Sequence, residues 1–98
     1  MRFEWDEAKN RRNLAKHRIS FENAKLVFED PHHLSVQDRV VEGEERWQTF
    51  GMIDGVSLLM VGHAYWEEEG EEVIRMISAR KATRQERRAY EEAREKSG

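Results

Sequence analysis

The sequence predicts an α+β domain in which a helical hairpin is followed by a four-stranded antiparallel sheet and a C-terminal helix. Before Pro31, apolar residues recur at about every fourth position, whereas after it they alternate, and β-branched and aromatic residues replace alanine. Asp54-Gly55 separates two apolar runs and is a strong signal for a two-residue hairpin. Thr83-Arg84-Gln85-Glu86 has the form of a capping box, in which two side chains satisfy free N–H groups at a helix start.

The composition limits the class of protein. A chain of 98 residues has room for one hydrophobic core, so we expect a single domain over residues 1–98. The absence of cysteine excludes disulfides, thiolate chemistry and cysteine-type zinc sites. The first residues, MRFEWDEAK, contain no apolar leader, and no segment approaches the ~20 apolar residues that span a bilayer. We therefore expect a cytoplasmic protein that does not contact membranes.

Two helices are expected before Pro31. Asp6 is a suitable N-cap for a helix that reaches about Arg18, although its apolar face is thin. That face consists of Ala8, Leu14 and Ala15. Ser20 is a suitable N-cap for the second helix, and Asp30-Pro31 ends it. Its apolar residues recur at helical spacing: Phe21, Ala24, Val27 and Phe28.

Four strands are expected after Pro31, at residues 34–38, 46–53, 56–66 and 73–78. A type I′ turn at Asp54-Gly55 makes the middle pair antiparallel. In the third run, the residues expected on both faces of the strand are apolar as far as Val61, which is typical of a central strand covered on both faces. An acidic turn containing Gly70 leads to the last strand. Residues 3–5 form either a short strand or a coil that anchors the start of the chain.

Charge is distributed unevenly along the chain, although the net charge is only -3. Residues 75–98 carry eight basic and four acidic side chains, whereas residues 31–74 carry two basic and ten acidic ones. The acidic excess falls in the expected turns at 42–45 and 67–72. This polarity permits a local basic site on a mildly acidic protein, although a charge run is often only a solvated face.

The last strand is expected to pass into the last helix through a cationic joint. Arg75 lies on the strand, and Arg80 and Lys81 lie between the strand and the Thr83 cap. Because both flanking elements are rigid, these side chains would be held in fixed positions, as a site for phosphate or carboxylate requires. The alternative is that they are ordinary solvated cations.

Five segments carry a resemblance to a known family. They are FEWDEAKNRRNLAKH, SFENAKLVFEDP, EGEERW, GHAYWEE and VIRMISARKATRQERRAYE, and they are spread over nearly the whole chain, from residue 3 to residue 91. On these segments the sequence resembles the BrnT toxins of bacterial type II toxin–antitoxin modules. The last segment is the most specific, because amphipathicity alone does not produce ISARKAT followed by RxERRxYE. Asp6-Glu7 stands where the family often has Asp-Pro.

The resemblance implies a RelE-like fold and an endoribonuclease that inhibits translation until a cognate antitoxin neutralises it. The implied antitoxin is BrnA-like, with a ribbon-helix-helix part that binds DNA, so the toxin would contact DNA only indirectly. We expect RNA cleavage by 2′-hydroxyl attack, with no cofactor and no metal. Two alternatives remain open, a non-catalytic module that binds RNA or the ribosome and an interaction protein that co-represses transcription.

Such cleavage needs a base, an acid and cations for the charge that develops on phosphate. The candidates for the phosphate are Arg75, Arg80 and Lys81, and further cations expected to bind RNA are Lys16, Arg84, Arg87 and Arg88. The candidates for proton transfer are His17, Glu45 and Tyr90. Each has a structural alternative: a helix-end cation for His17, a solvated ion pair with Arg46 for Glu45, and packing on the sheet for Tyr90.

The remaining histidines are not expected to act in catalysis. His63 interrupts the central strand and is expected to be a buried, hydrogen-bonded core residue, and His32 and His33 are expected at the surface. No histidine pair has i, i+4 spacing, so a metal site built from these residues is not expected.

Overall fold

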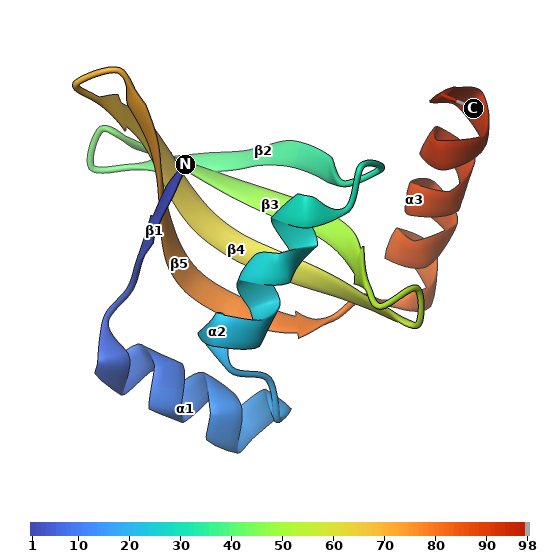
Figure 1. The fold of residues 1–98 in the computed structure, drawn as a ribbon, viewed down its shortest axis with the longest axis horizontal. Helices are drawn as coiled ribbons and strands as arrows, with labels where there is room; N and C mark the ends of the chain where they lie inside the picture. The colour runs from blue at the N-terminus through green and yellow to red at the C-terminus, as the bar shows by residue number, and fades with distance from the viewer. Residues whose placement is uncertain (98) are drawn as a thin grey trace.

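A five-stranded sheet with helices on both faces forms the computed structural model, which describes residues 1–97 (Figure 1). The elements are β1 (Arg2–Glu4), α1 (Glu7–His17), α2 (Phe21–Ala24), the 3-10 helix η1 (Lys25–Glu29), β2 (Leu34–Val41), β3 (Glu44–Ile53), β4 (Ser57–Glu68), β5 (Glu71–Lys81) and α3 (Arg84–Ser97). The strand order is β1-β5-β4-β3-β2. The predicted α+β class is confirmed. Among residues 1–97, no helix is both long and apolar enough to cross a membrane.

The prediction of a purely antiparallel four-stranded sheet is wrong in one respect. Residues 2–4 form β1, which pairs in parallel with β5 and places Phe3 opposite Ile74. Three residues are too few to show alternation in a sequence, and the partner strand lies about seventy residues away along the chain. The Phe3 ring also packs on Phe28, with ring centroids 5.4 Å apart. The sheet is therefore mixed, with β1 covering only the first part of the β5 edge.

Short turns connect the antiparallel strands: two residues each at 42–43 and 69–70, and three residues, 54–56, between β3 and β4. The predicted Asp54-Gly55 turn is confirmed, with φ of 54° and 67° as the type I′ geometry requires. Glu42-Gly43 and Glu69-Gly70 also have positive φ, at 50° and 79° and at 52° and 80°. Because glutamate rarely occupies this region, these two turns are harder to recognise in the sequence. The strands on either side of them are accordingly longer than predicted.

The two faces of the sheet are covered differently. We call the face under α2 and η1 the helical face, and the opposite face the open face. The core of the helical face includes Phe21, Ala24, Val27, Val61, Ile74, Met76 and Ala79. A smaller core forms where α3 packs on one end of the open face, and it consists of Phe50, Leu58, Met60 and Tyr90. Because α3 lies at one end of the sheet, no helix formed by residues 1–97 covers the rest of the open face (Figure 1).

Buried asparagines, and not apolar residues, attach α1 to the sheet. The expectation of an apolar face is wrong, because Leu14 is 48% exposed and Ala8 and Ala15 are exposed, whereas Asn10 and Asn13 are buried. The Asn13 amide donates to the Ile19 and Ala79 carbonyls at 2.9 Å each.

The same side chain also accepts a bond from the edge of β5. Its Oδ1 accepts the Ala79 N–H at 3.0 Å, so Asn13 pairs with both backbone groups of Ala79. Asn10 Oδ1 accepts the Phe21 N–H at 2.8 Å and thereby joins α1 to α2. These side chains satisfy buried backbone groups that would otherwise be unpaired.

We predict that Asn13→Ala destabilises the domain by about 2–4 kcal/mol, because it leaves buried backbone groups without partners. Leu14→Ala, on the adjacent position of the same helix, should change stability by less than about 0.5 kcal/mol because Leu14 is exposed. Denaturant unfolding measures both. Equal losses for the two variants would contradict the attachment of α1 through Asn13.

Candidate functional site

Two arginines and a glutamate form a cluster on the open face. Arg46, Ala64 and Arg75 lie side by side on β3, β4 and β5, with the small Ala64 between the two arginines. Glu44 bridges them, accepting the Arg46 Nε–H at 2.9 Å through Oε1 and a bond from Arg75 Nη2 through Oε2. The Arg75 guanidinium lies 5.3 Å from the centroid of the Trp66 ring. One carboxylate joins two guanidinium groups, so the cluster keeps a positive charge.

The cluster is held in place but remains open to a ligand. Burial raises the pKa of Glu44, but the hydrogen bonds and charges of Arg75 and Arg46 outweigh burial and bring this pKa below its usual value. Glu44 is therefore ionised at neutral pH. The Arg75 side chain is 41% exposed, and a guanidinium has five N–H donors, so donors remain for phosphate oxygens.

Arg80 lies farther along β5 on the same face and binds the start of α3. Its Nη1 and Nη2 donate to the two carboxylate oxygens of Glu86 at 2.8 and 3.0 Å. The predicted capping box is confirmed: Thr83 N–H donates to Glu86 at 2.8 Å, and Glu86 N–H donates to the Thr83 hydroxyl at 3.2 Å. Arg80 thus joins the strand to the cap of the helix.

The expected cationic joint takes a different form. β5 extends through Lys81, so Arg80 and Lys81 are both strand residues, and the joint itself is only Ala82-Thr83. Successive strand residues point to opposite faces. Arg80 pairs opposite Met60 of the open-face core, whereas Lys81 pairs opposite Leu59 of the helical-face core. The two cations therefore do not meet at one site.

A bulge in β5 connects the open face to α1. The β4–β5 register shifts at Gly62, and Ile77 and Ser78 share the extra position. These two residues line a hollow of about 100 Å³ on the open face, beside Arg46. They also line a groove of about 350 Å³ beside α1, together with Lys9, Arg12, Asn13, Lys16 and His17. We call Arg46, Arg75, Ser78 and the basic residues of this groove (Lys9, Arg12, Lys16, His17) the cationic track.

The Ser78 side chain occupies the space beside Gly62, which has no side chain of its own. A Cβ atom at Gly62 would lie 2.7 Å from the Ser78 hydroxyl oxygen. A larger residue would therefore displace the hydroxyl from the point where the hollow and the groove meet.

The other predicted site residues lie apart from the arginine cluster. Tyr90 is 1% exposed, and its hydroxyl donates to Asp30 at 2.5 Å. Burial, with the Asp30 interaction, raises the pKa of Tyr90 to about 12. Tyr90 therefore packs on the sheet, which was the structural alternative to a role in proton transfer. Arg84, Arg87 and Arg88 are exposed on α3, where Arg87 pairs with Glu91 at 3.7 Å.

Glu44, and not the predicted Glu45, is the carboxylate that contacts Arg46. Alternation along β3 places Glu45 on the face opposite Glu44. Glu44 and Arg46 are two residues apart, so on one strand they share a face. This signal could be used only if the strand were expected to begin before Arg46. Ser78 and Trp66 were also missed as site residues, because the bulge and the ring contact depend on pairing between strands.

The prediction that His63 is a buried, hydrogen-bonded core residue is confirmed. It is buried, and its Nε2 shares a hydrogen bond of 2.7 Å with the Thr49 hydroxyl. Burial lowers the His63 pKa. Within residues 1–97, no group of three His, Asp or Glu side chains is arranged to hold a metal ion.

Comparison with known proteins identifies the family. The profile of the family described as "Ribonuclease toxin, BrnT, of type II toxin-antitoxin system" matches residues 5–86. The chain belongs to the BrnT toxin family. The resemblance seen in the sequence is confirmed, and membership implies an RNA substrate and an antitoxin partner.

A solved structure supports the fold of this BrnT-family chain. The 1.1 Å crystal structure of the Brucella abortus ribonuclease toxin BrnT matches with a TM-score of 0.65 and 22% sequence identity. The match covers 86% of this chain and 99% of that chain. No curated protein sequence matches.

The Arg80–Glu86 pair predicts a dependence of stability on pH. The Arg80 hydrogen bond outweighs burial and lowers the pKa of Glu86 from 4.5 to about 2. This contribution to stability, on the order of 2–3 kcal/mol, is present above pH ~4.5 and is lost as the pH falls toward ~2. Glu86→Gln should remove that part of the acid dependence. Glu91→Gln, on the exposed side of α3, should leave it unchanged in denaturant unfolding measured across this range.

Proposed function

We propose that the chain is an endoribonuclease that cleaves RNA by 2′-hydroxyl attack on the adjacent phosphate, without a metal ion, and binds its substrate along the cationic track. The observation that carries this proposal is the pair Arg46 and Arg75, joined by Glu44 on an open sheet face. Two guanidinium groups on β3 and β5, separated only by the small Ala64 of β4, can contact one phosphate.

The arginine pair supplies the charge stabilisation that the reaction requires. When the 2′-oxygen attacks phosphorus, negative charge builds up on the phosphate oxygens until the bond to the 5′-oxygen breaks. Arg75 is fixed by Glu44 and by the Trp66 ring, so little reorganisation is needed as this charge develops. Glu44 is an ionised carboxylate beside both guanidinium groups, and we assign it as the acceptor of the 2′-hydroxyl proton, while the leaving 5′-oxygen takes a proton from water.

The rest of the track binds the flanking RNA. Lys9, Arg12, Lys16 and His17 line one groove along α1, which meets the open face at Ser78. A strand of RNA crossing the bulge would place successive phosphates on the arginine pair and on α1. Arg84, Arg87 and Arg88 extend the basic surface on α3, where Arg80 positions the start of the helix.

In the cell, this activity would inhibit translation by cutting RNA in the cytoplasm. We propose a BrnA-like antitoxin with a ribbon-helix-helix part as the neutralising partner, with DNA contacted only through the complex. The RelE-like character of the fold belongs to the same proposal. The family's type II toxin–antitoxin assignment supports an antitoxin in general, and the BrnA-like identity rests on the sequence resemblance.

We predict that Arg75→Ala lowers the rate of RNA cleavage about 10²- to 10³-fold, because it removes a positioned donor to the developing charge. The assay incubates the partner-free protein with a defined RNA in excess EDTA and maps the fragment ends. Wild-type protein should give 2′,3′-cyclic or 3′-phosphate ends. The matched control is Arg11→Ala, which removes an exposed arginine of α1 outside the groove and should keep nearly full activity.

Two outcomes of this assay would contradict the proposal. Cleavage that stops in EDTA would show that a metal ion is required. Binding of RNA without new ends, including on ribosomes, would favour the non-catalytic binding module. Thermal unfolding of the Arg75→Ala protein separates a lost catalytic group from a lost fold.

The α1 groove predicts a specific change in salt dependence. Lys16→Gln should reduce the slope of log affinity against log salt concentration by about 0.7 for a single-stranded RNA, since one phosphate contact is lost. Arg11→Gln removes the same charge from the same helix, outside the groove, and should leave the slope unchanged. Equal slopes for both variants would mean that α1 acts only through its overall charge.

A further inference from the structure

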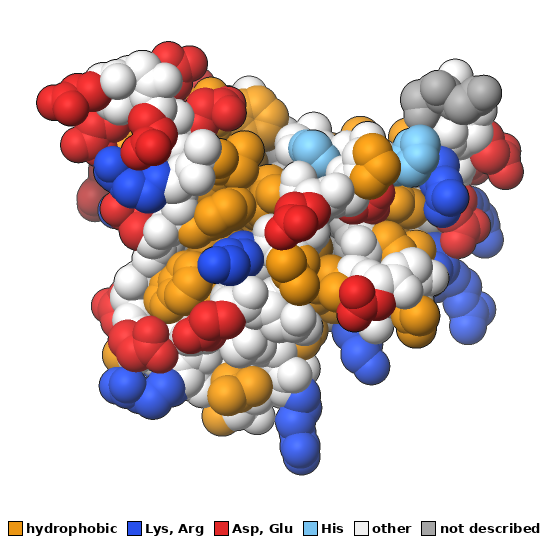
Figure 2. Space-filling view, viewed as in Figure 1, with side chains coloured by type: hydrophobic (Ala, Val, Ile, Leu, Met, Phe, Trp, Pro, Cys, Tyr) orange, Lys and Arg blue, Asp and Glu red, His pale blue; other side chains and the backbone are white. Residues whose placement is uncertain are grey.

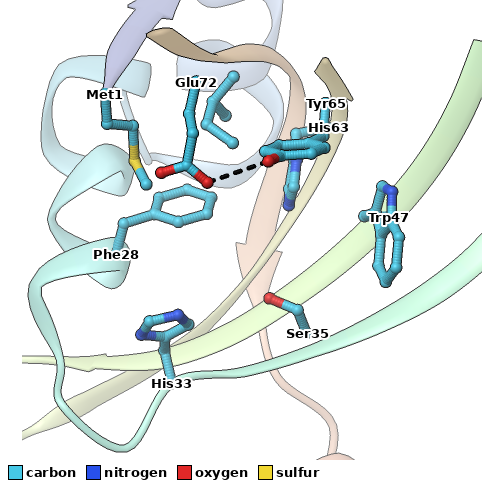
Figure 3. A pocket seen from close by; sticks show the side chains of 9 residues that line it. Met1, Phe28, His33, Ser35, Trp47, His63, Tyr65 and Glu72 are labelled. Carbon is cyan, nitrogen blue, oxygen red and sulfur yellow. Dashed lines mark hydrogen bonds between the residues drawn. The ribbon is translucent and has the colours of Figure 1, made fainter. Parts of the chain in front are cut away.

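A second cavity lies on the helical face, opposite the arginine cluster (Figure 3). It has a volume of about 220 Å³ and lies between η1 and strands β2 to β5. Three aromatic side chains, Phe28, Trp47 and Tyr65, form much of its wall. We call this cavity the aromatic pocket. It is smaller than the ~300–1,000 Å³ of sites for drug-sized ligands, so it suits a single side chain or ring.

An exposed carboxylate, that of Glu72, lies in this pocket. Figure 3 shows the Glu72 carboxylate between Met1, Phe28 and Tyr65. The Tyr65 hydroxyl donates to it at 3.0 Å. Within residues 1–97, no lysine or arginine forms an ion pair with Glu72, whereas Arg2 pairs with the neighbouring Glu68 and Glu71.

The surroundings of the pocket are acidic. Exposed glutamates occupy the β4–β5 hairpin that ends at the pocket: Glu67, Glu68, Glu69, Glu71 and Glu72. Figure 2 shows these acidic side chains gathered at the upper left, over that hairpin. One guanidinium, that of Arg2, pairs with two of the five carboxylates. The local potential therefore attracts cations and repels phosphates.

We propose that the aromatic pocket is a docking site for a protein partner, which inserts one arginine or lysine side chain from a basic segment. Cations bind favourably over aromatic rings, three of which line the pocket, and Glu72 supplies the opposite charge. The side chain enters beside a hairpin whose charge complements a basic segment. This inference does not depend on the chemistry proposed for RNA.

Trp47, which lines the pocket, also carries a buried hydrogen-bond donor. The Trp47 Nε1–H is buried and has no hydrogen-bond partner within the described residues. Buried donors are normally paired. Because this N–H is inaccessible, the Trp47 indole serves as a reporter on the pocket and not as a contact for the partner.

A nucleobase fits the pocket less well. A base could stack on the rings, but its phosphates would lie beside the acidic hairpin and on the face opposite Arg46 and Arg75. The partner favoured by the charge is therefore a basic protein segment.

NMR titration tests the proposal directly. The Trp47 indole N–H signal, assigned with Trp47→Phe, reports on the pocket. The probes are the blocked tripeptides acetyl-Gly-Arg-Gly-amide and acetyl-Gly-Glu-Gly-amide, and the nucleosides adenosine and guanosine. We expect the arginine peptide to shift the Trp47 signal saturably, and the glutamate peptide and the nucleosides to leave it in place.

Two glutamine variants separate the pocket from the general field of the hairpin. Glu72→Gln removes the charge and keeps an oxygen for the Tyr65 hydroxyl, and it should weaken binding of the arginine peptide about three- to tenfold. Glu69→Gln makes the same charge change at the hairpin turn, outside the pocket, and should weaken it less than about twofold.

Other outcomes overturn the proposal. A nucleoside that shifts Trp47 while the arginine peptide does not would make this a base-binding pocket. Equal weakening by both variants would mean that the peptide follows only the hairpin charge. The absence of any shift with all four probes would mean that the pocket binds none of these groups.

Discussion

The arrangement of the site depends on one side chain, Asn13, which pairs with both backbone groups of Ala79 on the edge of β5. β1 covers only the start of that edge, and Asn13 satisfies part of the remainder. The contact fixes α1 against the bulged segment of β5. A helix with few apolar residues is thereby held where its cations border the same residues, Ile77 and Ser78, that line the open face. Polar pairing, and not hydrophobic burial, assembles the cationic track.

The structure also separates charge between its surfaces, which explains how a chain of net charge -3 can present a basic site. The acidic residues gather in the hairpin turns at one end of the sheet, and the cations of the track lie on the open face and α1. Where the two regions meet, Glu44 joins Arg46 and Arg75 and fixes their geometry. A polyanion and a basic protein segment would therefore be directed to different surfaces.

The features that the sequence predicted correctly depend on a few neighbouring residues. The caps at Asp6 and Ser20, the Asp54-Gly55 turn and the Thr83 capping box are all local. The errors concern longer-range pairing. β1 pairs with residues far along the chain, and the docking of α1 through asparagine is invisible to a search for apolar periodicity. A strand that begins two residues earlier than expected brings Glu44 into β3, and alternation then places it, and not Glu45, beside Arg46.

The central claim is that RNA lies across the β5 bulge, in contact with both the arginine pair and α1. NMR mapping with a short RNA blocked by 2′-O-methyl groups tests it most directly, because the blocked strand binds without being cut. The account predicts that the largest shifts fall on the backbone amides of Ile77 and Ser78, on the side chains of Arg46 and Arg75, and on the groove side of α1. Shifts confined to the exposed arginines of α3, with the bulge unchanged, would contradict it.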